Sequence, residues 1–232
     1  MSLKDRGLAI VSLLVLAIGV SACCAPCSWI TERGITWRGI TGSGRLITEE
    51  LDYQGFTKLE ISSAFEVELT QSSEYRVVVT TDDNVVDDLR VDVVGDTLRI
   101  GLRPTIGLSN VTLRAEVSMP ILEGLELSGA SRLDGEMETG DVRFELSGAS
   151  RLILDGAGGD LRLNASGASQ VDLSGFQVGD ADVEVSGASQ ATVYVTGRLD
   201  AEASGASQVR YLGDPTLGRI DTSGASTVSP AR

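Results

Sequence analysis

Apolar and polar residues alternate along most of the chain beyond residue 45. A period of two is typical of strands with one buried and one solvated face. The alternation predicts strands over residues 58–62, 65–69, 75–79, 89–94, 97–102 and 111–117. Gly95-Asp96 separates two of these segments and indicates a hairpin turn. No segment shows a sustained helical period with capping residues, so we expect an almost entirely β domain.

The word Ser-Gly-Ala-Ser occurs six times in the C-terminal half. Its copies begin at Ser128, Ser147, Ser166, Ser186, Ser204 and Ser223, with spacings of 19, 19, 20, 18 and 19 residues. Recurrence at nearly fixed spacing indicates a repeat architecture. The small residues fit where chains stack closely, and glycine adopts backbone angles that other residues avoid. We therefore expect a corner of one stacked coil at each of Gly129, Gly148, Gly167, Gly187, Gly205 and Gly224.

Aligned on their first serine, the six copies form columns of similar residues. Three positions before the serine, all are apolar: Leu125, Phe144, Leu163, Val183, Ala201 and Ile220. Two positions before it, all are polar: Glu126, Glu145, Asn164, Glu184, Glu202 and Asp221. Each copy thus carries a half-buried strand, and the coil is too short for helical repeats. The pattern predicts a parallel β-helix, or β-solenoid, with coils of about 19 residues stacked at about 4.8 Å.

Ser62-Ser63-Ala64-Phe65 resembles a decayed copy of the word. In that case residues 71–117 form an insertion before regular coiling resumes. We accordingly expect one β-helix domain over residues 45–228, with an irregular N-terminal β part (45–120) followed by repeat coils (121–228).

Residues 1–22 have the features of a secretion signal, with a positively charged start and a 13-residue apolar run that is short for a membrane span. The run ends in Val20-Ser21-Ala22-Cys23, which resembles the lipobox of bacterial lipoproteins. This resemblance implies that Cys23 carries the lipid; an ordinary signal peptide is the alternative. The glycine-containing residues 23–44 are interpreted as a lipid-anchored tether.

The composition argues against several functions. The formal net charge of −14 over 232 residues disfavours binding to nucleic acid or to anionic lipid surfaces. Histidine is absent and all three cysteines precede residue 28, which removes the commonest metal ligands and a Ser/His/Asp triad. No phosphate-binding or nucleophile-elbow motif is present. We expect a non-enzymatic protein with no cofactor, no metal and no nucleic-acid partner.

The polar column Glu126, Glu145, Asn164, Glu184, Glu202 and Asp221, here called the acidic ladder, is the candidate binding feature. Stacked carboxylates repel one another and need solvent, cations or arginines nearby. Arg143, Arg162 and Arg219 lie two residues before ladder positions and are placed to offset the charge. One interpretation is a solvated face that discourages aggregation; the other is a calcium-sensitive binding strip.

Three further segments accompany the repeated word: Gly42-Ser43-Gly44, residues 55–61 and residues 119–125. Together they resemble the DUF2807 family of bacterial envelope proteins, described as putative autotransporter adhesin, head GIN domain. The resemblance covers about residues 42–228. It implies a right-handed parallel β-helix on an exported, often lipid-anchored protein.

These features predict an exported, lipid-anchored protein of the bacterial cell envelope that displays an adhesin-like binding module. If the cell is Gram-negative, the expected location is the outer membrane. Its expected partners are the membrane, through the lipid anchor, and a cell-surface protein or polysaccharide. A purely structural envelope protein without a ligand is one alternative. A carboxylate-dependent enzyme acting on polysaccharides is another. The oligomeric state is left open.

Overall fold

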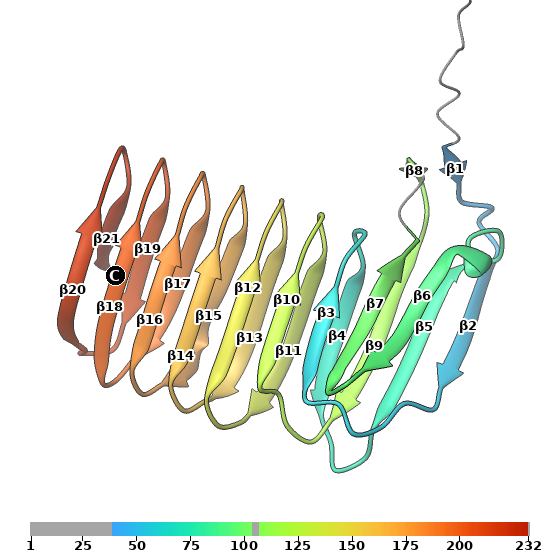
Figure 1. Cartoon of the computed structure of the whole chain (residues 1–232), viewed down its shortest axis with the longest axis horizontal. Coiled ribbons are helices and arrows are strands. Elements are labelled where there is room, and N and C mark those ends of the chain that lie inside the picture. The colour runs from blue at the N-terminus through green and yellow to red at the C-terminus, as the bar shows by residue number, and fades with distance from the viewer. Residues whose placement is uncertain (1–38, 104–106, 232) are drawn as a thin grey trace, which may run out of the picture. The chain divides into compact units, whose positions relative to one another are not determined.

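A computed structural model of the chain describes residues 39–103 and 107–231. Two large sheets face each other, and a pair of two-residue strands lies beside them (Figure 1). Within the described ranges there is no α-helix, and the one helical segment is the 3-10 turn η1 (Val86–Asp88). The prediction of an all-β fold is confirmed.

The strands divide between a nine-stranded sheet, a ten-stranded sheet and the small pair. In spatial order, the nine-stranded sheet contains β20 (Thr216–Thr222), β18 (Arg198–Ala203), β16 (Ala181–Val185), β14 (Leu161–Ala165), β12 (Val142–Leu146), β10 (Gly124–Leu127), β3 (Lys58–Ile61), β7 (Thr97–Leu102) and β6 (Leu89–Val94). The ten-stranded sheet contains β2 (Leu46–Leu51), β5 (Arg76–Asp82), β9 (Leu113–Met119), β4 (Glu66–Gln71), β11 (Arg132–Glu138), β13 (Arg151–Ala157), β15 (Gln170–Val178), β17 (Gln190–Val195), β19 (Gln208–Leu212) and β21 (Thr227–Pro230). The small pair is β1 (Ile40–Thr41) and β8 (Leu108–Ser109).

Each Ser-Gly-Ala-Ser word joins a strand of the nine-stranded sheet to the next strand of the ten-stranded sheet. The word at Ser147, for example, joins β12 to β13. β12 pairs in parallel with β10 and β14, and β13 pairs in parallel with β11 and β15, so successive coils stack directly on one another. Leu125 is the register partner of Phe144, and Phe144 is that of Leu163. The predicted β-solenoid with coils of about 19 residues is confirmed.

The inward columns meet between the two sheets and form one continuous core. Phe144 and Val183 of the nine-stranded sheet are fully buried, as are Leu152 and Leu154 of the facing sheet. Phe144 and Phe176 contact each other across the interior, with ring centroids 6.2 Å apart. Full burial of each such side chain stabilises the fold by roughly 1.5–3 kcal/mol.

The segment Ser62–Phe65 forms a corner equivalent to those of the six words. Ile61, just before it, pairs with Leu127, and β3 and β4 pair in parallel with β10 and β11. Ser63 has a φ of 65°, close to the 79° of Gly129 in the next corner. The expectation of a decayed copy of the word is therefore confirmed.

The insertion after β4 contains a further coil that the alternation did not reveal. β7 pairs in parallel with β3, and β9 pairs in parallel with β4, so the β3–β4 coil lies between the β7–β9 coil and the β10–β11 coil. After the β3–β4 coil, the chain forms β5 and β6 at the N-terminal end of the solenoid. It then forms the β7–β9 coil and crosses to β10, on the other side of the β3–β4 coil (Figure 1). Residues 45–120 are thus more regular than predicted. Alternation identifies a strand but not its partner, which is why the sequence did not show this order.

Antiparallel strands extend the sheets at the N-terminal end of the solenoid. β5 pairs with β9, β2 pairs with β5, and β6 pairs with β7. Gly95 has a φ of 66° in the turn between β6 and β7, so the predicted Gly95-Asp96 hairpin is confirmed.

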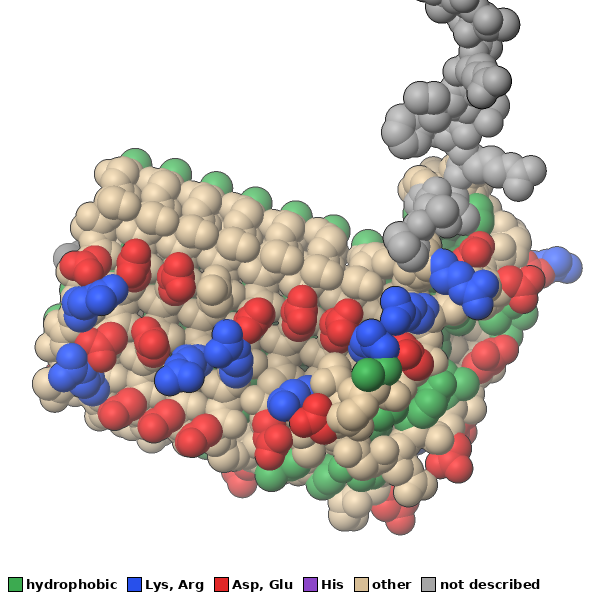
Figure 2. Space-filling view, in the orientation of Figure 1, with side chains coloured by type: hydrophobic (Ala, Val, Ile, Leu, Met, Phe, Trp, Pro, Cys, Tyr) green, Lys and Arg blue, Asp and Glu red, His purple; other side chains and the backbone are tan. Residues whose placement is uncertain are grey.

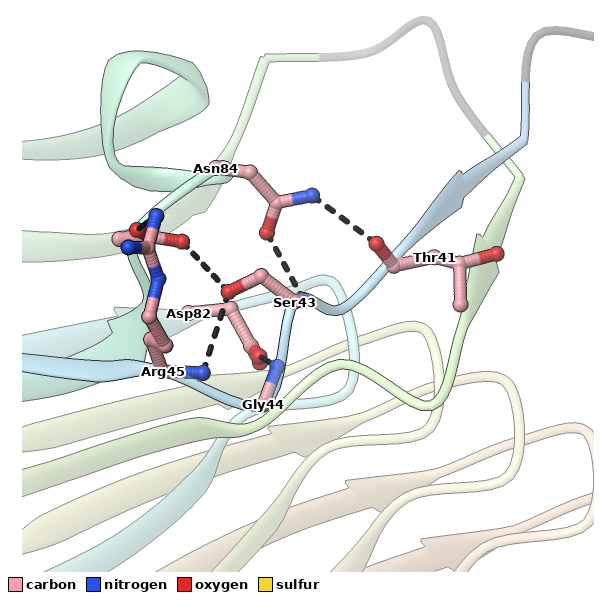
Figure 3. Close-up of polar contacts among 7 residues, drawn as sticks. Thr41, Ser43, Gly44, Arg45, Asp82 and Asn84 are labelled. Atoms are coloured by element: carbon pink, nitrogen blue, oxygen red, sulfur yellow. Dashed lines mark hydrogen bonds and ion pairs between the residues drawn. The ribbon is translucent and has the colours of Figure 1, made fainter.

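Residues 40–44 are bound to the folded body, which corrects their assignment to the tether. β1 pairs in parallel with β8, and the turn after β1 is held by polar contacts (Figure 3). The buried Asp82 carboxylate accepts the N–H of Gly44 at 2.6 Å and that of Thr112 at 2.8 Å. A Cβ at Gly42 would lie 2.9 Å from this carboxylate, so the glycine permits close packing and does not loosen the chain.

Asn84 and Asp83 complete this polar clasp (Figure 3). The Asn84 amide donates to the carbonyl of Thr41 at 2.9 Å and accepts the N–H of Ser43 at 3.1 Å. Asp83 accepts the Ser43 hydroxyl and pairs with Arg45. The hydrogen bond from Ser43 and the charge of Arg45 lower the pKa of Asp83, although desolvation opposes them. The clasp fixes the start of β2.

The described residues include no helix that is long and apolar enough to cross a membrane. Cys23 and the signal sequence lie outside the described residues, so lipid attachment at Cys23 stays a prediction.

Candidate functional site

The Ser-Gly-Ala-Ser corners have a structural explanation. Their glycines share φ values between 74° and 79°, and a Cβ on Gly167 would lie 2.5 Å from the carbonyl oxygen of Gly148 in the preceding corner. The last serine of the word is buried in five of the six copies, and Ser150 Oγ donates to the carbonyl of Ser147 at 2.9 Å. The same bond recurs in the words that begin at Ser128, Ser166, Ser204 and Ser223. Glycine and serine are therefore needed at these positions to stack the coils.

The acidic ladder lies in register on the outer face of the nine-stranded sheet. Its members follow one another as register partners in the order Glu126, Glu145, Asn164, Glu184, Glu202 and Asp221. The column also extends beyond the repeats, because Glu60 of β3 stands beside Glu126, and Arg99 of β7 stands beside Glu60. Figure 2 shows this face, with acidic side chains in rows across the strands and arginine side chains among them.

Two of the three predicted arginines offset ladder charges. Arg143 Nε lies 2.6 Å from Glu145, and Arg219 contacts both Glu202 and Asp221 at 2.9 Å. Arg162 makes no ion pair within the described part of the chain. The arginines therefore neutralise the ladder unevenly.

Glu126 lies where the ladder is poorly compensated. Partial burial raises the pKa of Glu126, and the neighbouring charges of Glu60 and Glu145 raise it further. Among the described residues, no group of three or more histidine, cysteine or acidic side chains is arranged to hold a metal ion. Whether the ladder is a solvated face or a calcium-sensitive strip therefore stays a prediction.

A second acidic column, missed in the sequence analysis, borders the same sheet. Asp141 Oδ1 accepts the N–H of Asp160 at 2.9 Å, and Asp160 Oδ1 accepts the N–H of Asp180 at 3.0 Å. Asp180 Oδ1 in turn accepts the N–H of Arg198 at 2.7 Å. The signal was present in the sequence, because Gly-Asp stands at the same place in three successive repeats. These carboxylates hold the second corner of three successive coils, as the words hold the first.

A groove of about 1020 Å³ crosses the outer face of the ten-stranded sheet. Outward side chains of β9, β4, β11 and β13 line it, and these strands are neighbours in space. They come from separate parts of the chain, so no local motif identifies the groove. It is the strongest candidate for a binding site on the described surface.

Two rows of charged side chains run across the groove. The first row consists of Arg114, Glu66 and Arg132, in register. The second row consists of Glu116, Glu68 and Asp134, in register. Arg132 joins the rows through two hydrogen bonds to Asp134, at 2.5 and 3.1 Å. The carboxylate holds the guanidinium in a fixed plane, from which its remaining N–H groups can bind a ligand.

The rest of the groove is acidic and rigidly supported. Glu136 and Asp155 are register partners on β11 and β13, and neither makes an ion pair with another described residue. Gln71 supports one side of the groove: its side-chain N–H donates to the carbonyl of Glu138 at 2.7 Å, and its Oε1 accepts the Glu138 N–H at 3.0 Å. The groove thus combines a row that contains guanidinium donors with carboxylate acceptors free of ion pairs.

The fold and these faces define a class of protein, a β-solenoid scaffold that presents broad and regular polar surfaces. Residues 55–215 match the family described as "Putative auto-transporter adhesin, head GIN domain" (DUF2807), and the chain belongs to this family. The resemblance found in the sequence is confirmed. No curated protein matches the chain.

Solved structures share the fold. A putative adhesin from Bacteroides fragilis NCTC 9343 is 18% identical with a TM-score of 0.68, covering 83% of this chain and 100% of that chain. A putative lipid binding protein from Parabacteroides distasonis ATCC 8503 is 17% identical with a TM-score of 0.53, covering 84% and 100%. A putative adhesin from the same strain is 14% identical with a TM-score of 0.52, covering 83% and 100%. At these identities the likeness concerns the fold, because unrelated functions share folds.

Proposed function

We propose that the chain is an exported envelope lipoprotein, anchored through Cys23, whose β-solenoid is a non-catalytic, adhesin-like binding module. Its ligand is an extended polar chain on another surface, a polysaccharide or a surface protein. The groove across β9, β4, β11 and β13 carries this proposal, since it combines the fixed guanidinium of Arg132 with carboxylate acceptors free of ion pairs over several strands.

Several features of the groove suit a long polar ligand. Its charged rows repeat from strand to strand at about 4.8 Å, so equivalent contacts recur along a bound chain. Its walls belong to paired strands, which hold the side chains in place before binding and limit the ordering cost. The described lining contains no aromatic residue, so hydrogen bonds and charge would provide recognition in place of ring stacking.

Binding assays with groove variants test this proposal. The purified chain is presented to arrays of polysaccharides and to intact cells, and the bound amount is compared with that of Arg132→Gln. Loss of a charged hydrogen-bond donor should weaken binding by about tenfold. Arg162→Gln is the matched control, because Arg162 is on the opposite sheet and makes no ion pair with a described residue. Absence of binding to every surface, or equal losses in both variants, would refute the groove as an adhesive site.

The membrane location of the protein is tested separately. Cys23→Ala should move the protein from the membrane fraction to the soluble exported fraction, because a single Cys23 lipid would be the anchor. Cys27→Ala is the control and should leave the distribution unchanged. Retention of Cys23→Ala in the membrane fraction would contradict anchoring through Cys23.

Cleavage of a polysaccharide is the second candidate, favoured by one observation. Glu136 and Asp155 are register partners on adjacent strands, and paired carboxylates about 5 Å apart are the arrangement of retaining glycosidases. Release of reducing ends from a bound polymer, abolished by Glu136→Gln or Asp155→Asn, would replace the adhesive proposal with an enzymatic one. A structural role without a ligand would be supported if neither binding nor cleavage is detected.

A further inference from the structure

The C-terminal end of the solenoid carries two strands with free outer edges. β20 and β21 are the last strands of their sheets, and each pairs with only one strand among the described residues. Such edges expose N–H and C=O groups that can bind a further strand. At the other end, the sheets end in the antiparallel strands β2 and β6, which also pair with one strand each among the described residues.

The core is incompletely covered at this end. Leu199 is fully buried, whereas its register partner Leu217 is 50% exposed. Val209 is fully buried, whereas its register partner Val228 is only partly buried. Ile220 continues the apolar column of the nine-stranded sheet and is also only partly buried. A further strand on each edge would complete the burial of these side chains.

The sequence of β20 is complementary to itself. Arg219 and Asp221 flank Ile220 and lie on the outer face, while Ile220 packs against the core. In antiparallel pairing, residues at equal distances on either side of the centre face each other. A pair centred on Ile220 therefore places Arg219 of each copy opposite Asp221 of the other.

We propose that two copies of this chain associate tail to tail, with β20 of one pairing antiparallel with β20 of the other around a two-fold axis at Ile220. The two Ile220 side chains then meet inside a continuous core. On the outer face, Arg219 of each copy, which already contacts Glu202 and Asp221 of its own chain, also faces Asp221 of the other copy. A centre at Arg219 would oppose two guanidiniums, and a centre at Asp221 would oppose two carboxylates, both of which destabilise a sheet. Charge thus favours Ile220 over its two neighbours as the centre. This association is independent of the ligand proposed for the groove.

The size of the end face sets the strength of the contact. Strands of about five residues rise about 17 Å, and two sheets about 10 Å apart bound an area of only a few hundred Å². Stable complexes bury about 800 Å² on each partner. We therefore expect a weak dimer that dissociates on dilution. A two-fold contact uses the C-terminal end of both copies, so assembly through this contact stops at two copies.

Sedimentation velocity of the full chain over a range of concentrations tests the proposal. The chain should shift reversibly from monomer to dimer as its concentration rises. Arg219→Asp and Asp221→Arg should each weaken association by about tenfold, because each change opposes like charges in two symmetric pairs. The double variant should restore association, because the swapped charges again attract. A thermal melt of each variant verifies that it is folded.

Two further variants distinguish this contact from others. With Cys23, Cys24 and Cys27 replaced by serine, Ile220→Cys should form a disulfide-linked dimer on oxidation, because a residue on the two-fold axis faces its own copy. Ile47→Cys in β2, at the opposite end, should not. A monomer at every concentration, or single charge variants that associate like the parent, would overturn the proposal. Open-ended polymers that disappear with Ile47→Lys would overturn it in favour of head-to-tail stacking.

Discussion

Replacement of Gly167 by alanine tests whether the corners hold the coils together. Gly167 has a φ of 78°, which costs a residue with a Cβ roughly 1–2 kcal/mol. The new Cβ would also lie 2.5 Å from the Gly148 carbonyl oxygen, so two coils must separate. Overpacking of this kind costs roughly 1–3 kcal/mol more. We expect Gly167→Ala to lower the free energy of unfolding by about 2–5 kcal/mol, which for a chain of this size is a fall in Tm of roughly 5–15 °C.

Gly95→Ala is the matched control for this prediction. Gly95 has a φ of 66° in the β6–β7 turn, but a Cβ there would have no atom within 4 Å. The free energy of unfolding should therefore fall only by the cost of the positive φ, roughly 1–2 kcal/mol. Chemical denaturation of both variants, followed by circular dichroism, measures the difference. If Gly167→Ala is no less stable than Gly95→Ala, close stacking of the corners is not what requires glycine.

Three further predictions concern carboxylates. Glu126 has a raised folded pKa, so its contribution to stability is present below its unfolded pKa near 4.5 and is lost as pH rises through the folded value. Glu126→Gln should therefore raise stability at pH 7, and the gain should vanish below pH 4 in thermal melts. Asp200 accepts hydrogen bonds from the Arg198 side chain and from the Arg219 N–H, which lower its pKa to about 2. The stability that Asp200 contributes should therefore be present above its unfolded pKa and lost as pH falls through about 2. An NMR titration of Asp200 measures this pKa. Asp82→Ala leaves the N–H groups of Gly44 and Thr112 without their acceptor and should cost about 3 kcal/mol in denaturant unfolding, with Asp82→Asn less affected.

Much of the fold could be predicted from the sequence, because the repeat makes each physical requirement appear several times. An apolar column such as Leu125, Phe144 and Leu163 marks the inner face of a strand wherever it recurs. The corner glycines are visible for the same reason, since every coil needs a positive φ at one place. The Asp141–Asp160–Asp180 column was equally periodic, but it lies outside the columns that were aligned next to the repeated word.

The candidate groove could not be predicted from the sequence in this way. Glu66 and Arg132 are far apart in the sequence, and they become neighbours only because β4 pairs with β11. Arg114 joins them because the chain leaves β4, adds β5 and β6, and returns through β9 to the other side of β4. The charges of these residues predict exposure, but exposure alone does not predict which charges meet.

The sequence by itself determined the coil, its length, its inward columns and its corners, because these depend on alternation and on local backbone angles that repeat along the chain. The tertiary structure alone decided which coils are neighbours around the insertion, where the groove lies and how the Gly42–Gly44 turn is held by Asp82. The physical reason is that hydrogen bonds between strands can form at many registers and in many orders. Only the packing of the whole core selects one of them.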